Sequence, residues 1–293
     1  MHFVGTTRSI IPTVTHVIDG GAQVTGVTSL GDDVFVVRWD EREQVEVYDV
    51  TFTLQRRLSV PGLGRSYGLA ACARNNCLYA ADFDNDRVHR VQLSGSNTVT
   101  KWSVGRAPDG LTVNSAKNVL VVIQGERKLQ QFTTLGTLLQ TIQLQPDIEI
   151  PIQVVELSSG QFVISHRGIH HRVCLLDVKG AVVRSSEGMK VSRLTKMNLP
   201  VGLTVDDDEN ILVADGDNRL LVLDRSLGSA REMSVSVDGG LKDPHTLWYD
   251  KSRGRLCIGE WSGRVIIIDH LKDFTAVSGI PEFRPGRRHE TSR

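Results

Sequence analysis

Short apolar runs divide this chain from end to end. Runs of five to seven residues, either alternating with polar positions or continuously apolar, are separated by clusters of Gly, Asp, Asn and Pro. No stretch repeats apolar residues at i, i+3 and i+4 over three turns, as an amphipathic helix would. The pattern therefore predicts an all-β protein.

One type of apolar run recurs at a regular interval and ends each time just before a polar loop. Its last residues are Asp40, Asp82, Gln124, His166, Asp215 and Glu260, which are 42, 42, 42, 49 and 45 residues apart. Each interval holds four strand-like runs and no helix, and self-similarity of this length is typical of β-propellers. The sequence predicts a six-bladed β-propeller with four-stranded antiparallel blades.

The sixth unit lacks a convincing fourth strand. Three runs, at 246–249, 256–259 and 265–268, are followed by a Pro- and Arg-containing segment, whereas residues 13–18 alternate as a strand does and precede the first unit. We expect this N-terminal strand to complete the sixth blade and close the ring, because closure removes an open sheet edge. The chain is predicted to be a single propeller domain, 1–293, with repeats over about 13–270 and a tail at 271–293.

The fifth unit carries a recognisable motif. Residues 200–206 read Pro-Val-Gly-Leu-Thr-Val-Asp, residues 210–215 read Asn-Ile-Leu-Val-Ala-Asp, and Asn218 and Arg219 follow. This motif resembles the NHL repeat, and the second unit is similar through Asp82, Asn85 and Arg87. The resemblance implies a platform that binds protein or RNA, of the kind found at the end of larger tripartite-motif proteins. The zinc spacings of their RING and B-box domains are absent from this sequence, so ligase activity is not implied.

The motif residues also have structural uses. We expect glycines to allow inner strands to converge, prolines to stiffen the segment before each inner strand, and Asp and Asn side chains to hold the polar loops. The glycines are Gly68, Gly110 and Gly202, and the prolines are Pro108, Pro200 and Pro244. Gln124, His166 and Glu260 stand where the pattern has Asp. Departures of this kind are candidate functional positions.

Six residues directly precede the inner strands and are expected to line the mouth of the central channel. They are Thr25, Tyr67, Asp109, Ile152, Val201 and His245. Asp109, Tyr67 and His245 suit acid–base or metal chemistry. A metal-dependent lyase or hydrolase is therefore one alternative, because the peptidyl-hydroxyglycine amidating lyase and calcium-dependent esterases have similar propellers. However, His follows Pro in only one unit here, and Ile152 and Val201 cannot ligate calcium.

The same face is predicted to carry anchors for a macromolecular partner. Aromatic and Arg side chains dominate protein interfaces, and they also stack on single-stranded RNA. The prediction is a non-catalytic scaffold that binds a protein or peptide on its loop-rich face, with RNA binding by that face as an alternative and no cofactor. The expected binding residues are Trp39, Arg65, Tyr67, Phe83, Arg106, Asp109, Arg127, His166, His245 and Trp261. His166 opens a loop with His170 and His171, which we expect to be exposed.

Composition narrows the partners further. Hydrophobic residues make up 40% of the chain, and 34 Lys and Arg balance 34 Asp and Glu, so no overall field attracts nucleic acid or lipid. No apolar run approaches the roughly 20 residues of a membrane helix, and the start of the chain lacks a signal-peptide pattern. We expect a cytoplasmic, monomeric domain, alone or within a larger protein. Cys72 and Cys77 flank a predicted turn, which leaves a disulfide open.

Overall fold

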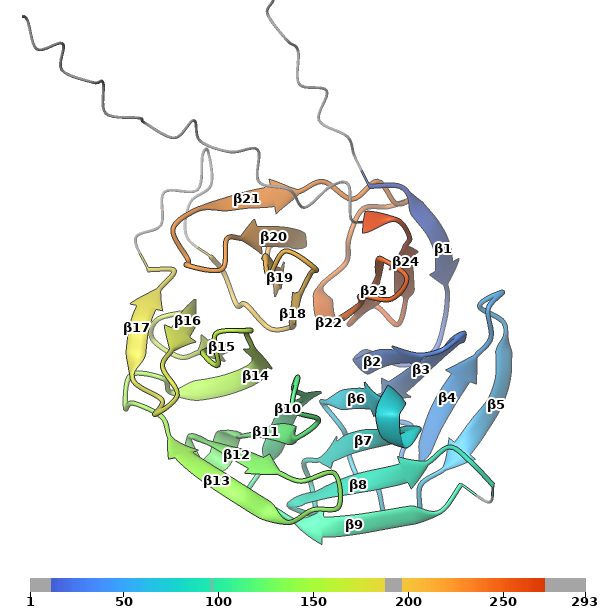
Figure 1. Cartoon of the computed structure of the whole chain (residues 1–293). Helices are drawn as coiled ribbons and strands as arrows, with labels where there is room; N and C mark the ends of the chain where they lie inside the picture. The colour runs from blue at the N-terminus through green and yellow to red at the C-terminus, as the bar shows by residue number, and fades with distance from the viewer. Residues whose placement is uncertain (1–11, 96, 188–196, 272–293) are drawn as a thin grey trace, which may run out of the picture.

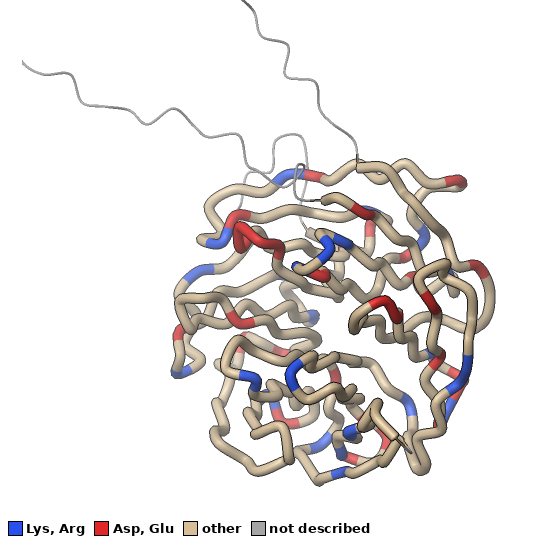
Figure 2. Tube along the Cα trace, turned by 45° about the vertical axis from the view of Figure 1, so that its right-hand side comes forward, with Lys and Arg blue, Asp and Glu red and all other residues tan. Residues whose placement is uncertain are grey.

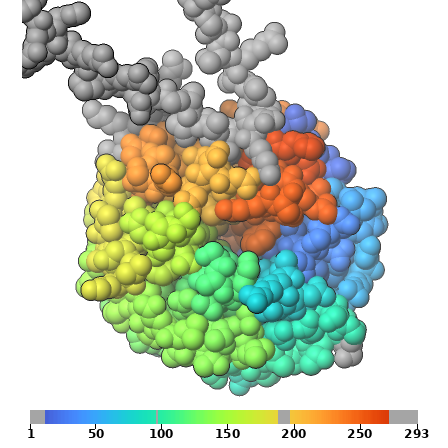
Figure 3. Space-filling view, viewed as in Figure 1, coloured from blue at the N-terminus to red at the C-terminus, as the bar shows by residue number. Residues whose placement is uncertain are grey.

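Six sheets surround a central axis. The computed structural model describes residues 12–95, 97–187 and 197–271. Within these ranges the strands form six four-stranded antiparallel sheets, arranged like the blades of a propeller (Figure 1). The space-filling view from the same direction shows the blades following one another around the ring in sequence order (Figure 3). The predicted all-β, six-bladed architecture is confirmed.

The first three blades are continuous in sequence, each running from the axis outward. Blade 1 consists of β2 (Val24–Leu30), β3 (Asp33–Arg38), β4 (Gln44–Tyr48) and β5 (Leu54–Ser59). Blade 2 consists of β6 (Leu69–Cys72), β7 (Cys77–Asp82), β8 (Arg87–Gln92) and β9 (Val99–Ser103). Blade 3 consists of β10 (Pro108–Val113), β11 (Val119–Ile123), β12 (Lys128–Phe132) and β13 (Leu138–Gln143).

The remaining blades follow the same order, except that the last takes its outer strand from the N-terminus. Blade 4 consists of β14 (Ile150–Glu156), β15 (Phe162–Arg167), β16 (Arg172–Leu176) and β17 (Val182–Ser185). Blade 5 consists of β18 (Leu203–Val205), β19 (Ile211–Asp215), β20 (Arg219–Leu223) and β21 (Ala230–Met233). Blade 6 consists of β22 (Pro244–Asp250), β23 (Arg255–Glu260), β24 (Val265–Ile268) and β1 (Val14–Ile18).

Strand β1 closes the ring as predicted. It pairs antiparallel with β24, with Ile18 opposite Val265 and Val14 opposite Ile268. Ile18 is only 7% exposed and packs with Val24, Val265 and other residues between blades 6 and 1. The two ends of the described chain are therefore held in one sheet. From residue 272 on, the predicted tail lies outside the described residues.

The core consists of wedges between neighbouring blades. One wedge joins Tyr79 and Val88 of blade 2 to Leu111 and Val121 of blade 3, all within 1% of complete burial. Inner strands approach so closely that a Cβ on Gly202 would lie 2.8 Å from the carbonyl oxygen of His245. The equivalent atom on Gly68 would lie 2.7 Å from the Asp109 carbonyl oxygen, so glycine is required where the blades converge.

The polar residue that ends the second strand fastens its blade to the preceding loop. Asp82 accepts a hydrogen bond from the Gly64 amide and pairs with His89, with 2.9 Å between Nε2 and Oδ2. Asp215 likewise accepts a hydrogen bond of 2.7 Å from the Asn198 amide and forms an ion pair of 2.6 Å with Arg219. The acidic motif positions are thus used structurally, because each buried carboxylate accepts hydrogen bonds from the preceding loop and from a side chain of its own blade.

In three blades the second strand ends at a different residue from the one that the sequence predicts. Strand β3 ends at Arg38 instead of Asp40, β11 at Ile123 instead of Gln124, and β15 at Arg167 instead of His166. In the first two of these blades the expected strand end is a polar residue of the following loop, whereas cross-strand pairing sets the real strand end. The amides of Trp39, Phe83 and Trp261 make the same hydrogen bond to the preceding loop, so these three positions are equivalent.

In the described ranges, charged residues, helices and cysteines show no feature that sets one blade apart as a charged or membrane-spanning region. Basic and acidic positions are interspersed around the ring (Figure 2). The helices of the described ranges are two single turns, η1 (Ala73–Asn75) and η2 (Gln124–Glu126), so no described helix is long enough to cross a membrane. Cys72 and Cys77 face each other in the ladder between β6 and β7, and both are buried free thiols.

Candidate functional site

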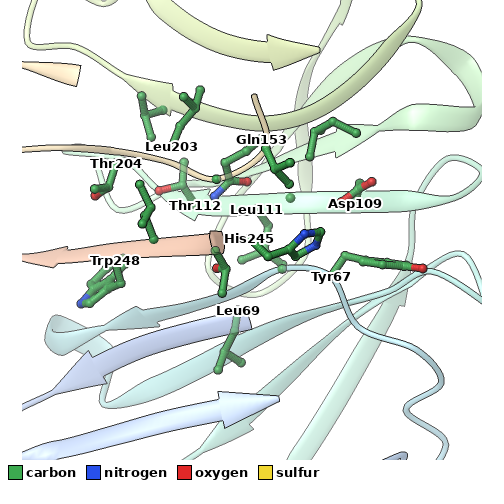
Figure 4. Close-up of a pocket in the computed structure, with 18 residues that line it drawn as sticks. Tyr67, Leu69, Asp109, Leu111, Thr112, Gln153, Leu203, Thr204, His245 and Trp248 are labelled. Atoms are coloured by element: carbon green, nitrogen blue, oxygen red, sulfur yellow. The ribbon is translucent and has the colours of Figure 1, made fainter. Parts of the chain in front are cut away.

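Irregularities in the inner strands direct side chains into the channel. The pairing of the first two strands shifts register at Thr25, Asp109, Ile152 and His245, and a bulge of this kind re-aims the extra residue. Tyr67, Asp109 and His245 gather toward one end of a narrow channel of about 40 Å³ (Figure 4). Of the six expected mouth residues, Thr25 is completely buried and does not line this channel.

Five rings form a continuous arc at this end, which we call the aromatic arc. Phe83 and Tyr67 of blade 2 have ring centroids 5.1 Å apart, and Tyr67 lies 5.3 Å from Trp39 of blade 1. Trp39 lies 5.4 Å from Trp261 of blade 6, which lies 4.7 Å from His245. These tilted and edge-on contacts are the favourable geometries for aromatic pairs. The arc thus spans blades 2, 1 and 6.

Arg65 covers part of the arc. Its guanidinium carbon lies 5.1 Å from the centroid of Trp39 and 5.6 Å from that of Phe83. An ion pair of 2.6 Å to Asp84 holds it there. The side chain is therefore a fixed, partly neutralised cation at the rim of the arc.

A cavity of about 500 Å³ lies against the arc. Trp39, Tyr67, His245 and Trp261 form its aromatic wall. The rest of the lining comes from Arg167, Leu199, Val201, Gly216, Asn218 and Asp243. A volume of this size, apolar on one side and with a few polar groups on the other, is typical of a site for a small ligand or a peptide side chain.

Arg167 is a residue of this cavity that sequence reasoning did not select. Among the described residues its Nε is buried without a hydrogen-bond partner, and its side chain forms no ion pair. It directly follows His166 at the end of a second strand, the position that Trp39, Phe83 and Trp261 occupy in other blades. Comparing that position across all six units would have revealed it.

Burial and Arg167 together set the protonation of the mouth. Burial raises the pKa of Asp109 to about 7, against the opposing effect of Arg167. Burial lowers the pKa of His245 to about 4, and Arg167 lowers it further. Gln124 donates a hydrogen bond of 2.6 Å to Asp109. At neutral pH, His245 is an uncharged ring and Asp109 lies close to its titration midpoint. Arg167 is then the cation in the lining of the cavity, which also contains the carboxyl group of Asp243.

Three predicted binding residues lie elsewhere. His166 is completely buried, and its Nε2 accepts a hydrogen bond of 3.0 Å from Arg172, so it is a blade-internal residue and not part of an exposed loop. Arg106 and Arg127 are exposed on blade 3 and lie outside the lining of the cavity. Arg127 donates instead to the carbonyl oxygen of Pro146 at 3.3 Å. The ring contacts of Phe83 lead toward blades 1 and 6, away from these arginines.

Comparisons with known proteins identify the fold. No protein-family model matches the chain, and no curated protein sequence matches it. Its structure is similar to that of a catalytically inactive virginiamycin B lyase from Staphylococcus aureus with quinupristin, with a TM-score of 0.61 and 14% identity over 85% of this chain and 84% of that one. The propeller is what they share.

Two other solved structures match to a similar extent. Hydrazine synthase of Kuenenia stuttgartiensis matches with a TM-score of 0.61 and 13% identity, covering 92% of this chain and 99% of that one. The WD40 propeller domain of Doa1 matches with a TM-score of 0.59 and 13% identity, covering 90% and 99%. At these identities the similarity is one of fold, and one fold supports many functions. No group of three or more His, Cys, Asp or Glu with metal-binding geometry occurs within residues 12–95, 97–187 and 197–271.

Proposed function

We propose that this propeller is a non-catalytic scaffold that binds a protein segment at the aromatic arc. The observation that carries the proposal is the cavity of about 500 Å³ between the arc and the unpartnered Arg167. Half-buried Trp, Tyr and Arg side chains around a pocket are the usual anchors of a protein interface. The resemblance to NHL repeats supports the same function, since propellers of that kind are binding platforms.

The cavity suits a peptide with both an apolar and an acidic side chain. The arc would bury the apolar side chain, and a carboxylate would complete the hydrogen bonding of Arg167, because guanidinium and carboxylate match in geometry. The exposed Asp243 lines the same cavity. This mixed charge favours a peptide over the uniformly negative backbone of RNA.

Selection from a displayed library of random peptides tests the proposal. The intact chain serves as bait, and the Trp261→Ala protein serves as counter-bait to remove peptides that bind elsewhere. We expect the enriched peptides to combine an aromatic or aliphatic residue with Asp or Glu. Truncating Trp261 should weaken their binding by about 2–4 kcal/mol, the range of a central interface anchor.

Two further variants sharpen the result. Arg167→Gln should selectively weaken the binding of acidic peptides. Arg106→Ala, which truncates an exposed Arg in the loop before β10 of blade 3, should change their affinity little. Enrichment that is insensitive to Trp261 and Arg167 would exclude this site. Binding of a labelled single-stranded RNA with a steep salt dependence, lost in the same variants, would favour RNA. Stoichiometric metal that depends on His245 would favour a lyase or hydrolase.

A further inference from the structure

The opposite end of the channel opens into a second, larger cavity. Its volume is about 600 Å³, and every blade contributes the end of its inner strand and the hairpin that follows. The narrow channel shares Thr204 and Trp248 with it, and Figure 4 shows these two residues at the end opposite to Tyr67 and Asp109. The two cavities therefore lie on opposite faces of the ring, and a ligand of one does not contact the other.

The walls of this cavity are mostly apolar. Val113, Val155, Leu157 and Val205 line it, together with the half-buried indole ring of Trp248. Trp248 is fixed by a hydrogen bond of 2.9 Å from its Nε1 to Ser29 of the neighbouring blade 1. A concave site of this volume with a rigid aromatic wall is suited to a small organic molecule with a flat apolar body.

The carboxylates of the lining differ in how they are partnered. Glu209 accepts hydrogen bonds from the amide and hydroxyl of Ser158. Asp250 accepts one of 3.0 Å from Ser29 and one of 2.6 Å from Ser252. Both are therefore used to hold the hairpins in place.

Glu156, at the end of β14, is the exception among them. Asn114 hydrogen-bonds to its carboxyl group, but within the described chain Oε2 is buried and has no partner. No described cation forms an ion pair with it. A buried carboxylate oxygen without a donor is costly. Glu156 also lines the cavity, so its carboxyl group can accept a hydrogen bond from a charged N–H group of a ligand there.

We infer that this second cavity binds a small arylalkyl amine, with the ammonium group on Glu156 and the aromatic ring against Trp248. The inference is independent of the proposed peptide site, since it uses other residues on the other face. It also gives the propeller two separable ligand sites joined by one axis.

Three indole probes of similar shape but different charge test the inference on the full chain. Tryptamine is a cation, tryptophol is neutral and indole-3-propionate is an anion at neutral pH. Ligand-observed NMR and calorimetric titration should give the order tryptamine, tryptophol, indole-3-propionate. We expect tryptamine to bind at least about tenfold more tightly than tryptophol, as a hydrogen bond between charged groups requires.

Two variants separate charge recognition from apolar contact. Glu156→Gln should remove the preference for tryptamine and leave tryptophol binding unchanged, whereas Trp248→Leu should weaken both. Glu232→Gln, an exposed Glu on β21, is the matched control and should have no effect. Thermal melts establish whether each variant is folded. If the Glu156→Gln protein does not fold, the Trp248→Leu protein still tests the site.

The inference is overturned by any of three results. The first is equal binding of all three probes, and the second is absence of binding at millimolar tryptamine. The third is an unchanged tryptamine preference in folded Glu156→Gln protein.

Discussion

Closure of the ring by β1 leads to a quantitative prediction for two adjacent residues. Ile18 is 7% exposed and packs between blades 6 and 1, whereas Val17, one position earlier on the same strand, is 37% exposed. Both pair with β24 through their backbones. Truncating Ile18 to Ala should therefore lower the free energy of unfolding by about 2–5 kcal/mol, the usual cost of truncating a buried aliphatic side chain. Truncating Val17 to Ala should change it by less than about 0.5 kcal/mol.

Deleting residues 1–18 should have a larger effect of a different kind. The deletion removes Ile18, the half-buried Val14, and the Thr15 hydroxyl bonds of 3.2 Å to the Ile267 carbonyl and 3.0 Å to Asp269. It also opens the edge of β24, whose four residues are all fully buried in the closed ring. An exposed apolar edge strand pairs readily with other chains, so we expect aggregation in addition to a lower melting temperature.

Urea unfolding monitored by circular dichroism measures the two point variants, and light scattering measures the deletion. The reasoning is refuted if Ile18→Ala and Val17→Ala lose the same stability. A shortened chain that melts as the full chain does and does not aggregate would contradict closure of the ring by β1.

Three further predictions concern individual residues. Because burial raises the pKa of Asp109 to about 7, its ionisation opposes folding, and this group costs stability as pH rises from about 4 to about 7. Asp109→Asn should therefore become increasingly more stable than the wild type over that interval in unfolding titrations, and a constant difference would contradict this. Gly202→Ala should lower stability by about 1–3 kcal/mol in thermal melts, because the added Cβ meets the His245 carbonyl oxygen at 2.8 Å. Asp82→Ala should cost about 1–3 kcal/mol, because it leaves the buried His89 ring and the Gly64 amide without their hydrogen-bond partner; the double variant lacking both side chains should recover part of that loss, and strict additivity would argue against the pairing.

Sequence patterns were most informative about features that repeat in every blade. The spacing of apolar runs follows from the need of each blade for four strands, so it predicted the number of blades and the closing role of residues 13–18. The convergence of inner strands at Gly68 and Gly202 was also foreseeable, because every repeat brings its backbone close to the next at the same place. Each repeat carries these features in its own sequence, so they can be recognised without knowing how the blades pack together.

The candidate site was only partly foreseeable. Tyr67 and His245 were predicted to line the mouth, and Trp39 and Trp261 to bind a partner on the same face. The structure places all four in the lining of one cavity. The continuity of the aromatic arc was not foreseeable, because Trp39 and Trp261 come from opposite ends of the chain and meet only when the ring closes.

Tertiary structure alone decided that Arg167, and not the predicted His166, lines the cavity. The two residues are neighbours, and the sequence favoured the His for binding. In the fold, successive residues of a strand point to opposite sides, so the choice depends on strand register. Pairing of β15 with β16 sets His166 opposite Arg172 inside the blade, and Arg167 then reaches the mouth. A one-residue difference in register is invisible in a polar loop of the sequence, and only the pairing of strands across the blade resolves it.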